Sequence, residues 1–215
     1  ILELRFDARF KCSALTVRII PTISRVAIPA AKLSPTRCSV RRRHAVADAE
    51  APEAATPHYS NSILEDTCMR EHLQHLHSEG SGFDAFARAA LLLKVWARQQ
   101  DLDGASGVSG FFLSMVLLYL VREKKVSRQM RALQLFRVAI RFLVDWLPAS
   151  IDFWAASQAA QRKAGRTLRP LAVRPAVGED ALVSSATLTA LRNAFAVVLL
   201  GPLGVVNVAA RLTPA

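Results

Sequence analysis

The chain has 215 residues, of which 52% are apolar and 21% charged, so it can bury a sizeable core and lies outside the composition of disordered proteins. Its net charge is +11, and residues 1–43 contribute +8, with ten Lys or Arg side chains against Glu3 and Asp7. This excess favours phosphate backbones or anionic membranes as partners, with a solvated basic face as the alternative. Three widely spaced cysteines argue against a disulfide framework and favour a reducing, intracellular compartment.

The first twenty residues have the pattern of strands. From Leu2 to Phe10, apolar residues occupy every second position and charged or polar residues lie between them, as in a half-buried strand. A second run, Ala14 to Ile20, is rich in β-branched residues and ends at Pro21. These runs predict the last strands of a sheet whose beginning is missing, so we expect the chain to be part of a longer protein.

A linker and two helices are expected next. Residues 44–57 are small, polar and Pro-containing without a periodic apolar face, which is typical of a linker at a domain boundary. Ser60 or Asn61 is expected to N-cap a helix that stops at the Gly80-Ser81-Gly82 turn. Asp84 is expected to cap the following helix.

The central element of the core is predicted between Ala89 and Val121, as a helix, a short loop and a second helix. The first helix has one apolar stripe, formed by Ala89, Leu92, Leu93, Trp96 and Ala97. No residue from Gly104 to Val121 is charged, so the second helix must be covered by other helices or by lipid. A membrane span is the weaker alternative, because the strongly apolar part, Phe111 to Val121, covers only about 16 Å.

A third long helix is expected to begin at Ser127 and to end at Pro148. Its apolar positions recur with helical spacing, and its outer face carries three arginines, Arg131, Arg137 and Arg141. The spacing of these arginines therefore predicts a second basic surface, distinct from the basic surface of the N-terminal residues.

The remainder of the chain is expected to be less regular. Residues 151–163 predict a short helix, residues 165–180 a loop, and residues 184–192 a helical turn. Residues 193–210 are uncharged, but a Gly201-Pro202-Leu203-Gly204 turn separates two β-branched runs. We therefore predict a C-terminal β-hairpin rather than a membrane span.

Side chains suited to a metal site occur near the end of the first helix, at Cys68, His72, His75 and His77. His77 falls on a different helix face from Cys68, and no second ligand pair with zinc spacing follows, so a solvated histidine-rich helix end is favoured. The sequence contains no Walker loop, dinucleotide fingerprint or nucleophile elbow. We expect neither a metal ion nor a cofactor.

Several stretches resemble known proteins. LLLKVWARQQDL (Leu91 to Leu102) followed by GVSGFFLSMVLLYL (Gly107 to Leu120) is similar to the helical substrate-binding domain of poly(A) polymerases and oligoadenylate synthetases. Together with that stretch, three further blocks resemble the Nrap family, the nucleolar RNA-associated proteins of the small-subunit processome: TPHYSNSILED (Thr56 to Asp66), ALQLFRVAIRFL (Ala132 to Leu143) and GPLGVVNVAARL (Gly201 to Leu212). TVRIIPTI and KLSPTRCSVR resemble the end of the family's preceding nucleotidyltransferase-like domain.

The resemblance implies an α+β fold in which the C-terminal strands of a nucleotidyltransferase-like sheet precede a mainly helical, substrate-binding-like domain closed by a β-hairpin. The corresponding division places the end of the nucleotidyltransferase-like domain at residues 1–43, a linker at 44–57, and the helical domain at 58–215. The chain is then a piece of a longer Nrap protein.

The resemblance also implies a degenerate active site. Active relatives hold two metal ions with three carboxylates, and the third carboxylate lies in a hydrophobic strand that matches residues 14–20, with Arg18 at its position. A cation there repels Mg²⁺. The other two carboxylates would lie upstream of Ile1, and Asp7 is an unproven substitute.

By this resemblance the protein is a non-catalytic scaffold and RNA-binding component of the small-subunit processome, acting in pre-ribosomal RNA processing and small ribosomal subunit biogenesis in the nucleolus of the nucleus. The implied partners are pre-ribosomal RNA, small nucleolar RNA and other processome proteins, with no membrane. The alternative is an active nucleotidyltransferase that adds nucleotides to RNA.

Six residues are expected to contact RNA, namely Arg37, Arg41, Arg42, Arg43, Lys94 and Ser109. The four arginines form a compact positive cluster in or beside the linker, and few aromatic residues accompany them, which predicts phosphate contacts without base readout. A solvated linker is the alternative. Lys94 and Ser109 match positions that lie near the nucleotide in active relatives, and structural packing is the alternative for both.

Overall fold

The computed structural model describes residues 2–5, 16–19, 23–24, 27–40, 54–102, 107–147 and 185–212. Most of the described residues are helical. The helices are η2 (Ala30–Leu33, a 3-10 helix), α1 (Pro57–Gly80), α2 (Asp84–Gln99), α3 (Gly110–Arg122), a helix over residues 132–147, and α5 (Ser185–Ala194). Two short strands, β1 (Leu2–Arg5) and β2 (Thr16–Ile19), pair antiparallel with Leu2 opposite Ile19.

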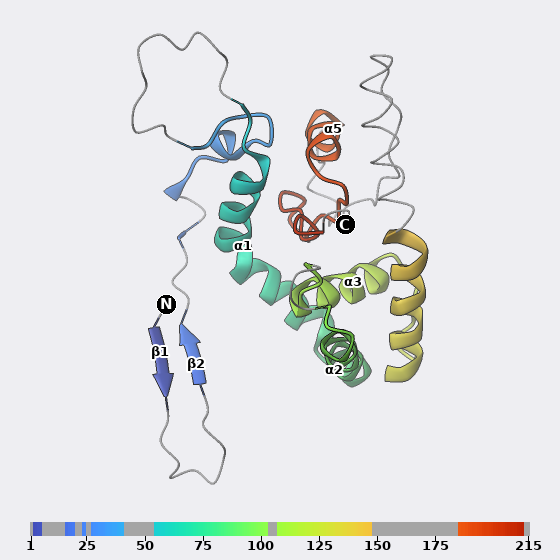
Figure 1. Ribbon diagram of the computed structural model, residues 1–215. Helices are drawn as coiled ribbons and strands as arrows, with labels where there is room; N and C mark the ends of the chain where they lie inside the picture. Colours follow the sequence, from blue (N-terminus) through green and yellow to red (C-terminus); the bar gives the residue numbers. More distant parts are fainter. Residues whose placement is uncertain are drawn as a thin grey trace, which may run out of the picture.

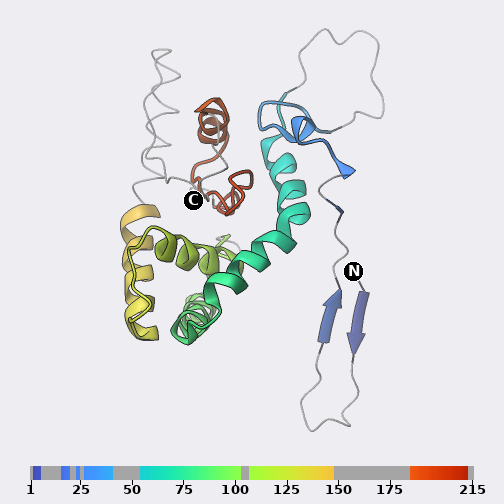
Figure 2. The same ribbon diagram turned by 180° about the vertical axis from the view of Figure 1, so that it is seen from behind.

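Helix α3 forms the centre of the helical part (Figure 1). Residues 112–120 are all buried, which agrees with the absence of charge in this stretch. Helix α2 packs against α3, and α1 contacts both of them. The 132–147 helix and the C-terminal turns lie on the remaining sides of α3 in both views (Figure 1 and Figure 2). The surrounding elements therefore supply the cover that an apolar helix needs.

The predicted helix starts differ from those observed. Helix α1 begins at Pro57 with Thr56 at the N-cap, and Ser60 and Asn61 are buried within its second turn instead of capping it. Proline suits this place because it has no N–H to satisfy and its φ is already helical. Helix α2 has Phe83 at its N-cap, and Asp84 is its first residue, where its carboxylate pairs with Arg88 at 2.7 Å.

The third long helix begins at residue 132, five residues after the predicted start at Ser127. Residues 127–130 form turns, in which Met130 N–H donates to the Ser127 carbonyl at 3.0 Å. The Oε1 of Gln134 accepts from Arg131 N–H at 2.8 Å, so a glutamine side chain caps the first turn from within the helix. The helix ends at residue 147, directly before Pro148.

The prediction of an α+β fold is wrong for the described residues, which are mainly helical. Within that part of the chain, strands β1 and β2 pair only with each other. The nucleotidyltransferase-like sheet that was predicted is therefore not seen. The predicted C-terminal β-hairpin is also wrong. Residues 195–212 form successive turns with a single bridge between Leu200 and Asn207.

The physical reason lies in Asn207, which is buried to 1% exposure. Its Oδ1 accepts from the N–H groups of Leu199 and Ala209, at 2.9 and 3.1 Å, and its Nδ2 donates to the Val197 carbonyl at 2.9 Å. These bonds satisfy backbone groups that a hairpin ladder would otherwise pair. The β-branched residues therefore pack into the core from turns.

Two further predictions can be compared with the structure. Helix α5 covers residues 185–194, where the sequence predicted a helical turn at 184–192. The predicted helix at 151–163 and the loop at 165–180 lie outside the described residues. Within the part of the chain that the structure describes, no helix is both long enough and apolar enough to span a bilayer.

Candidate nucleic-acid interface

The residues predicted to contact RNA are not gathered at one place among the described residues. Arg37 is exposed in the turn after η2, and its carbonyl accepts from Thr56 N–H at 3.0 Å. Arg41, Arg42 and Arg43 lie outside the described residues. Lys94 is exposed on α2, and Ser109 lies at the start of α3. The prediction for the arginine cluster therefore stays a prediction.

Lys94 and Ser109 have local structural contacts. The Oγ of Ser109 accepts from Phe112 N–H at 3.1 Å and so caps α3. The aliphatic stem of Lys94 lies over Gly110, where an added Cβ would come within 3.1 Å of the lysine Cγ. Ser109 thus caps α3, and Lys94 packs α2 against the first residue of α3. The RNA contact predicted for both residues stays a prediction.

A second concentration of positive charge follows α3. Residues 122–147 contain seven Lys or Arg residues against Glu123 and Asp145, a net charge of +5. Part of this charge surrounds an open cavity of about 490 Å³ between the end of α3, the following loop and the 132–147 helix. We call it the basic groove, and its lining residues are Leu120, Lys125, Arg137, Val138, Arg141, Phe142 and Asp145.

One aromatic ring, that of Phe142, lines the basic groove, and two buried rings lie beside it. The Lys125 ammonium lies 5.2 Å from the ring centroid of Tyr119 and 5.1 Å from that of Phe142, within the range of cation–π attraction. It also donates to the Tyr119 hydroxyl at 3.5 Å. The ring of Phe142 stacks on Trp146 with 5.4 Å between centroids and 15° between planes. These rings fix the place of the lysine.

Two arginines of the 132–147 helix also line the basic groove. Arg137 and Arg141 are one helical turn apart, and both side chains are exposed. Arg141 Nε lies 3.1 Å from Asp145 Oδ2, but the two side chains are 82% and 62% exposed, so solvent screens this pair. Within the described part of the chain, Arg137 forms no ion pair. The groove thus offers three cations and one carboxylate, and the arginines can form forked hydrogen bonds to phosphate oxygens.

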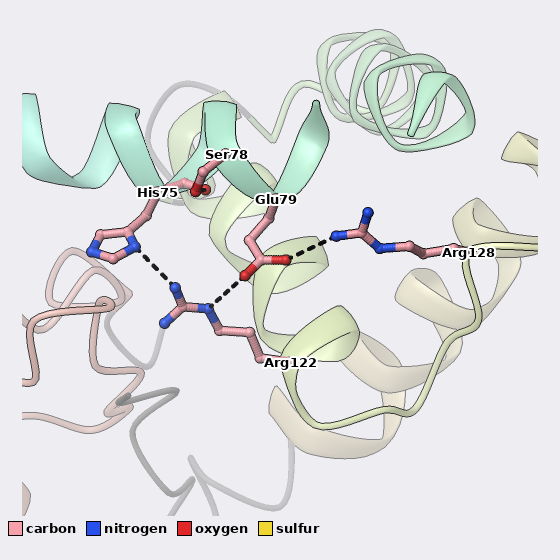
Figure 3. Close-up of polar contacts among 5 residues, drawn as sticks. All are labelled: His75, Ser78, Glu79, Arg122 and Arg128. Atoms are coloured by element: carbon pink, nitrogen blue, oxygen red, sulfur yellow. Dashed lines mark hydrogen bonds and ion pairs between the residues drawn. The ribbon is translucent and has the colours of Figure 1, made fainter. Parts of the chain in front are cut away.

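The loop that carries Lys125 is tied to α1 by a polar network (Figure 3). Glu79 accepts from Arg128 Nη2 at 3.3 Å and lies 3.8 Å from Arg122 Nε, while Arg122 Nη2 lies 2.9 Å from His75 Nδ1. Figure 3 shows Arg122 between His75 and Glu79. This arrangement requires an unprotonated His75 Nδ1, because the guanidinium can only donate.

The charge state of His75 follows from its surroundings. Burial lowers the pKa of His75 below its ordinary value, and the Arg122 guanidinium lowers it further, against the opposing effect of Glu79. The neutral imidazole can then accept from Arg122. The network therefore holds α1 against the end of α3 and the following loop most firmly at neutral pH.

The histidines do not form a metal site in the described residues. His72 is buried against Gly201 and lies 6.0 Å from the Phe111 ring, whereas His75 faces Arg122. The described parts of the chain contain no cluster of three or more His, Cys, Asp or Glu side chains that could hold a metal ion.

Sequence reasoning named Arg137 and Arg141 as part of an outer face but missed the contribution of Lys125. The signal was weak because the three partners, Tyr119, Lys125 and Phe142, belong to a helix, a loop and another helix. The available indication was the Lys124-Lys125 pair, which follows the apolar helix after one intervening glutamate.

Comparison with known proteins identifies two adjoining matches. A family model described as Nrap protein domain 1 matches residues 1–81, and one described as Nrap protein PAP/OAS-like domain matches residues 85–215. The two models change over at the turn between α1 and α2. The predicted domain division, with a linker at 44–57, stays a prediction.

Similar curated proteins are named nucleolar protein 6. The protein from Xenopus tropicalis is 34% identical over 162 residues, which is 75% of this chain and 12% of the relative. The human protein is 35% identical and the mouse protein 34% identical, each over 134 residues and 60% of this chain, which cover 12% and 11% of those relatives. The chain thus spans about 12% of the length of these relatives.

The name shared by the relatives places the protein in the nucleolus, within the nucleus. Because the Nrap PAP/OAS-like match alone covers more than half of the 215 residues, the chain belongs to the Nrap family.

Proposed function

We propose that the protein is a non-catalytic scaffold and RNA-binding component of the small-subunit processome, acting in pre-ribosomal RNA processing. The proposed partners are pre-ribosomal RNA, small nucleolar RNA and other processome proteins. The observation that carries the RNA-binding part is the basic groove, where Lys125, Arg137 and Arg141 surround one open cavity.

The charge of the basic groove suits a phosphate backbone. Each lysine or arginine that neutralises a phosphate releases a condensed counterion, which favours binding and makes it salt-dependent. The groove has one carboxylate, Asp145, and its pair with Arg141 is exposed. A phosphate can therefore approach Arg137 and Lys125 without displacing a buried ion pair.

The apolar side of the basic groove favours single-stranded RNA over a duplex. Phe142 is partly exposed and is held by its stack on Trp146, so it can offer part of a ring to a base. Since one partly exposed ring cannot read a sequence, we expect binding with little base preference. The N-terminal cluster of Arg37, Arg41, Arg42 and Arg43 is a second proposed phosphate contact.

The absence of catalysis is the third part of the proposal. In β2, Arg18 stands opposite Glu3 in the strand pair, at the position where the resemblance expects the third metal-binding carboxylate. A cation at that position disfavours two bound Mg²⁺ ions. The alternative, a nucleotidyltransferase that adds nucleotides to RNA, would require a complete carboxylate set in the full-length protein.

The basic groove can be tested with a triple variant, Lys125→Gln, Arg137→Gln and Arg141→Gln. Its affinity for a fluorescent single-stranded RNA is measured by anisotropy over a series of KCl concentrations. Loss of three phosphate contacts should flatten the log-log salt slope by about 2, at ~0.7 counterions per contact. The matched control, Lys32→Ala, Arg70→Ala and Arg88→Ala, removes three exposed cations outside the groove.

The two variants have the same net charge, so diffuse attraction should affect both equally. An unchanged slope in the groove variant, or equal flattening in the control, would mean that RNA is not bound in the basic groove. The scaffold part is tested separately, by affinity purification of the full-length protein from nuclear extract. Recovery of neither processome proteins nor pre-ribosomal RNA would refute that part.

A further inference from the structure

Helix α2 exposes a row of large aliphatic side chains. Leu91, Leu92 and Val95 are 62%, 41% and 47% exposed, although the sequence predicted Leu92 in the buried stripe. The buried positions of α2 are instead Phe86, Ala89, Leu93 and Ala97. The apolar part of α2 is thus wider than the part that this chain covers. We call Leu91, Leu92 and Val95 the α2 ridge.

The α2 ridge borders a hollow between α2 and the start of α3. The hollow has a volume of about 570 Å³, and its lining residues are Leu91, Lys94, Val95, Ala97, Arg98, Gln99 and Gly110. The stem of Lys94 packs over Gly110 and forms one wall. Positions 91, 94, 95 and 98 follow the spacing of one helix face, so an apolar side chain from a second helix can enter beside the ridge.

The rim of the α2 ridge is basic. Arg88, Lys94 and Arg98 follow its length, and residues 85–99 contain no Asp or Glu. Asp84, at the start of the helix, pairs with Arg88 in an exposed ion pair that solvent screens. An apolar ridge with a cationic rim complements an apolar ridge flanked by carboxylates. A second copy of this chain would bring the same rim and a net charge of +11, which disfavours self-association here.

We propose that the α2 ridge docks an amphipathic helix of a partner protein, with apolar residues at i, i+3 or i+4 and i+7 flanked by Asp or Glu. Leu91 and Val95 pack against the apolar residues of that helix, and Lys94 faces its carboxylates. This docking is independent of RNA binding in the basic groove.

The occupant can be identified by photo-crosslinking in the full-length protein. Benzoyl-phenylalanine is placed at position 92 and, as a control, at position 144, where Val144 is 63% exposed on the 132–147 helix. The expected crosslink from position 92 maps by mass spectrometry to an acidic amphipathic helix of another protein. The proposal is overturned if the crosslink from position 92 forms with RNA, with the same polypeptide, with a second copy or with a basic segment. It is also overturned if that crosslink is no stronger than the one from position 144.

The energetic role of the α2 ridge is tested with the partner so identified. Leu91→Gln with Val95→Gln should weaken its binding at least about tenfold, because these side chains are the proposed anchors. Leu133→Gln with Val144→Gln changes two equally exposed aliphatic residues on another helix and should leave the affinity unchanged. Equal weakening by both variants, or no weakening by the first, contradicts the proposal.

Discussion

Replacing Asn207 tests the account of the C-terminal turns most directly. The side chain is buried, and its amide makes three hydrogen bonds to backbone groups of Val197, Leu199 and Ala209. The Asn207→Ala variant leaves two N–H groups and one carbonyl without these partners. The backbone of residue 207 keeps its two bonds to Asn61, with Asn61 Nδ2 donating at 3.0 Å and Oδ1 accepting at 2.8 Å.

The expected loss can be estimated from the number of groups left unpaired. A buried polar group without a partner costs ~1–3 kcal/mol, so three such groups, partly relieved by local rearrangement, give about 3–5 kcal/mol. This is a large fraction of the ~5–15 kcal/mol that stabilises a typical domain. Asn61→Ala removes two other bonds and should cost about 2–3 kcal/mol on the same basis.

Urea unfolding followed by circular dichroism gives the free energy of unfolding of each variant. Asn193→Ala is the control, because Asn193 is exposed on α5 and should change stability little. In Asn207→Asp, an oxygen replaces the Nδ2 that donates to the Val197 carbonyl, so this near-isosteric change should also destabilise. A loss below about 1 kcal/mol in Asn207→Ala would refute the reasoning, since such a loss corresponds to roughly one hydrogen bond.

Three further predictions concern acid sensitivity, a turn and the linker. Because the pKa of His75 is lowered in the folded state, the unfolded state takes up the proton first as the pH falls below ~6.5, so the free energy of unfolding should decrease from pH 7 to 5. In urea unfolding, His75→Gln should reduce that decrease, whereas the control His77→Gln should not. Gly107 has φ +74°, and an added Cβ would lie 2.5 Å from the carbonyl oxygen of Arg211. Gly82 has a similar φ of +69°, but an added Cβ there would meet no atom within 4 Å. In urea unfolding, Gly107→Ala should therefore lower the free energy of unfolding by more than Gly82→Ala. Replacing Arg41, Arg42 and Arg43 by Ala should flatten the RNA salt slope by about two to three, and an unchanged slope would place the contact elsewhere.

The sequence predicted the helical centre because the relevant signals are local. Absence of charge from Gly104 to Val121 requires cover on all sides, and the structure buries residues 112–120. Helical spacing also located α2, but it placed Leu92 in the buried stripe. Periodicity gives the direction of an apolar face, whereas the width that becomes buried depends on which neighbours are present.

The C-terminal segment shows where local signals fail. β-branched runs around a Gly-Pro turn favour a hairpin. A hairpin forms, however, only if the backbone groups of the two runs pair with each other. A buried Asn207 competes for them and also binds Asn61, which is 146 positions earlier in the chain. A contact of such sequence separation cannot be found from periodicity or turn composition. For the same reason the sequence did not predict the basic groove, whose lining residues come from α3, the following loop and the 132–147 helix.

Helix α3 connects the two surfaces proposed to bind partners. Gly110, at its first residue, borders the hollow beside the α2 ridge, and Leu120, near its last turn, lines the basic groove. Ten residues of helix separate these positions by about 15 Å. Because α3 is buried along that length, packing fixes the spacing between the surfaces. The proposed RNA strand in the groove and the proposed helix on the ridge would then keep a fixed spacing, which is what the proposed scaffold role requires.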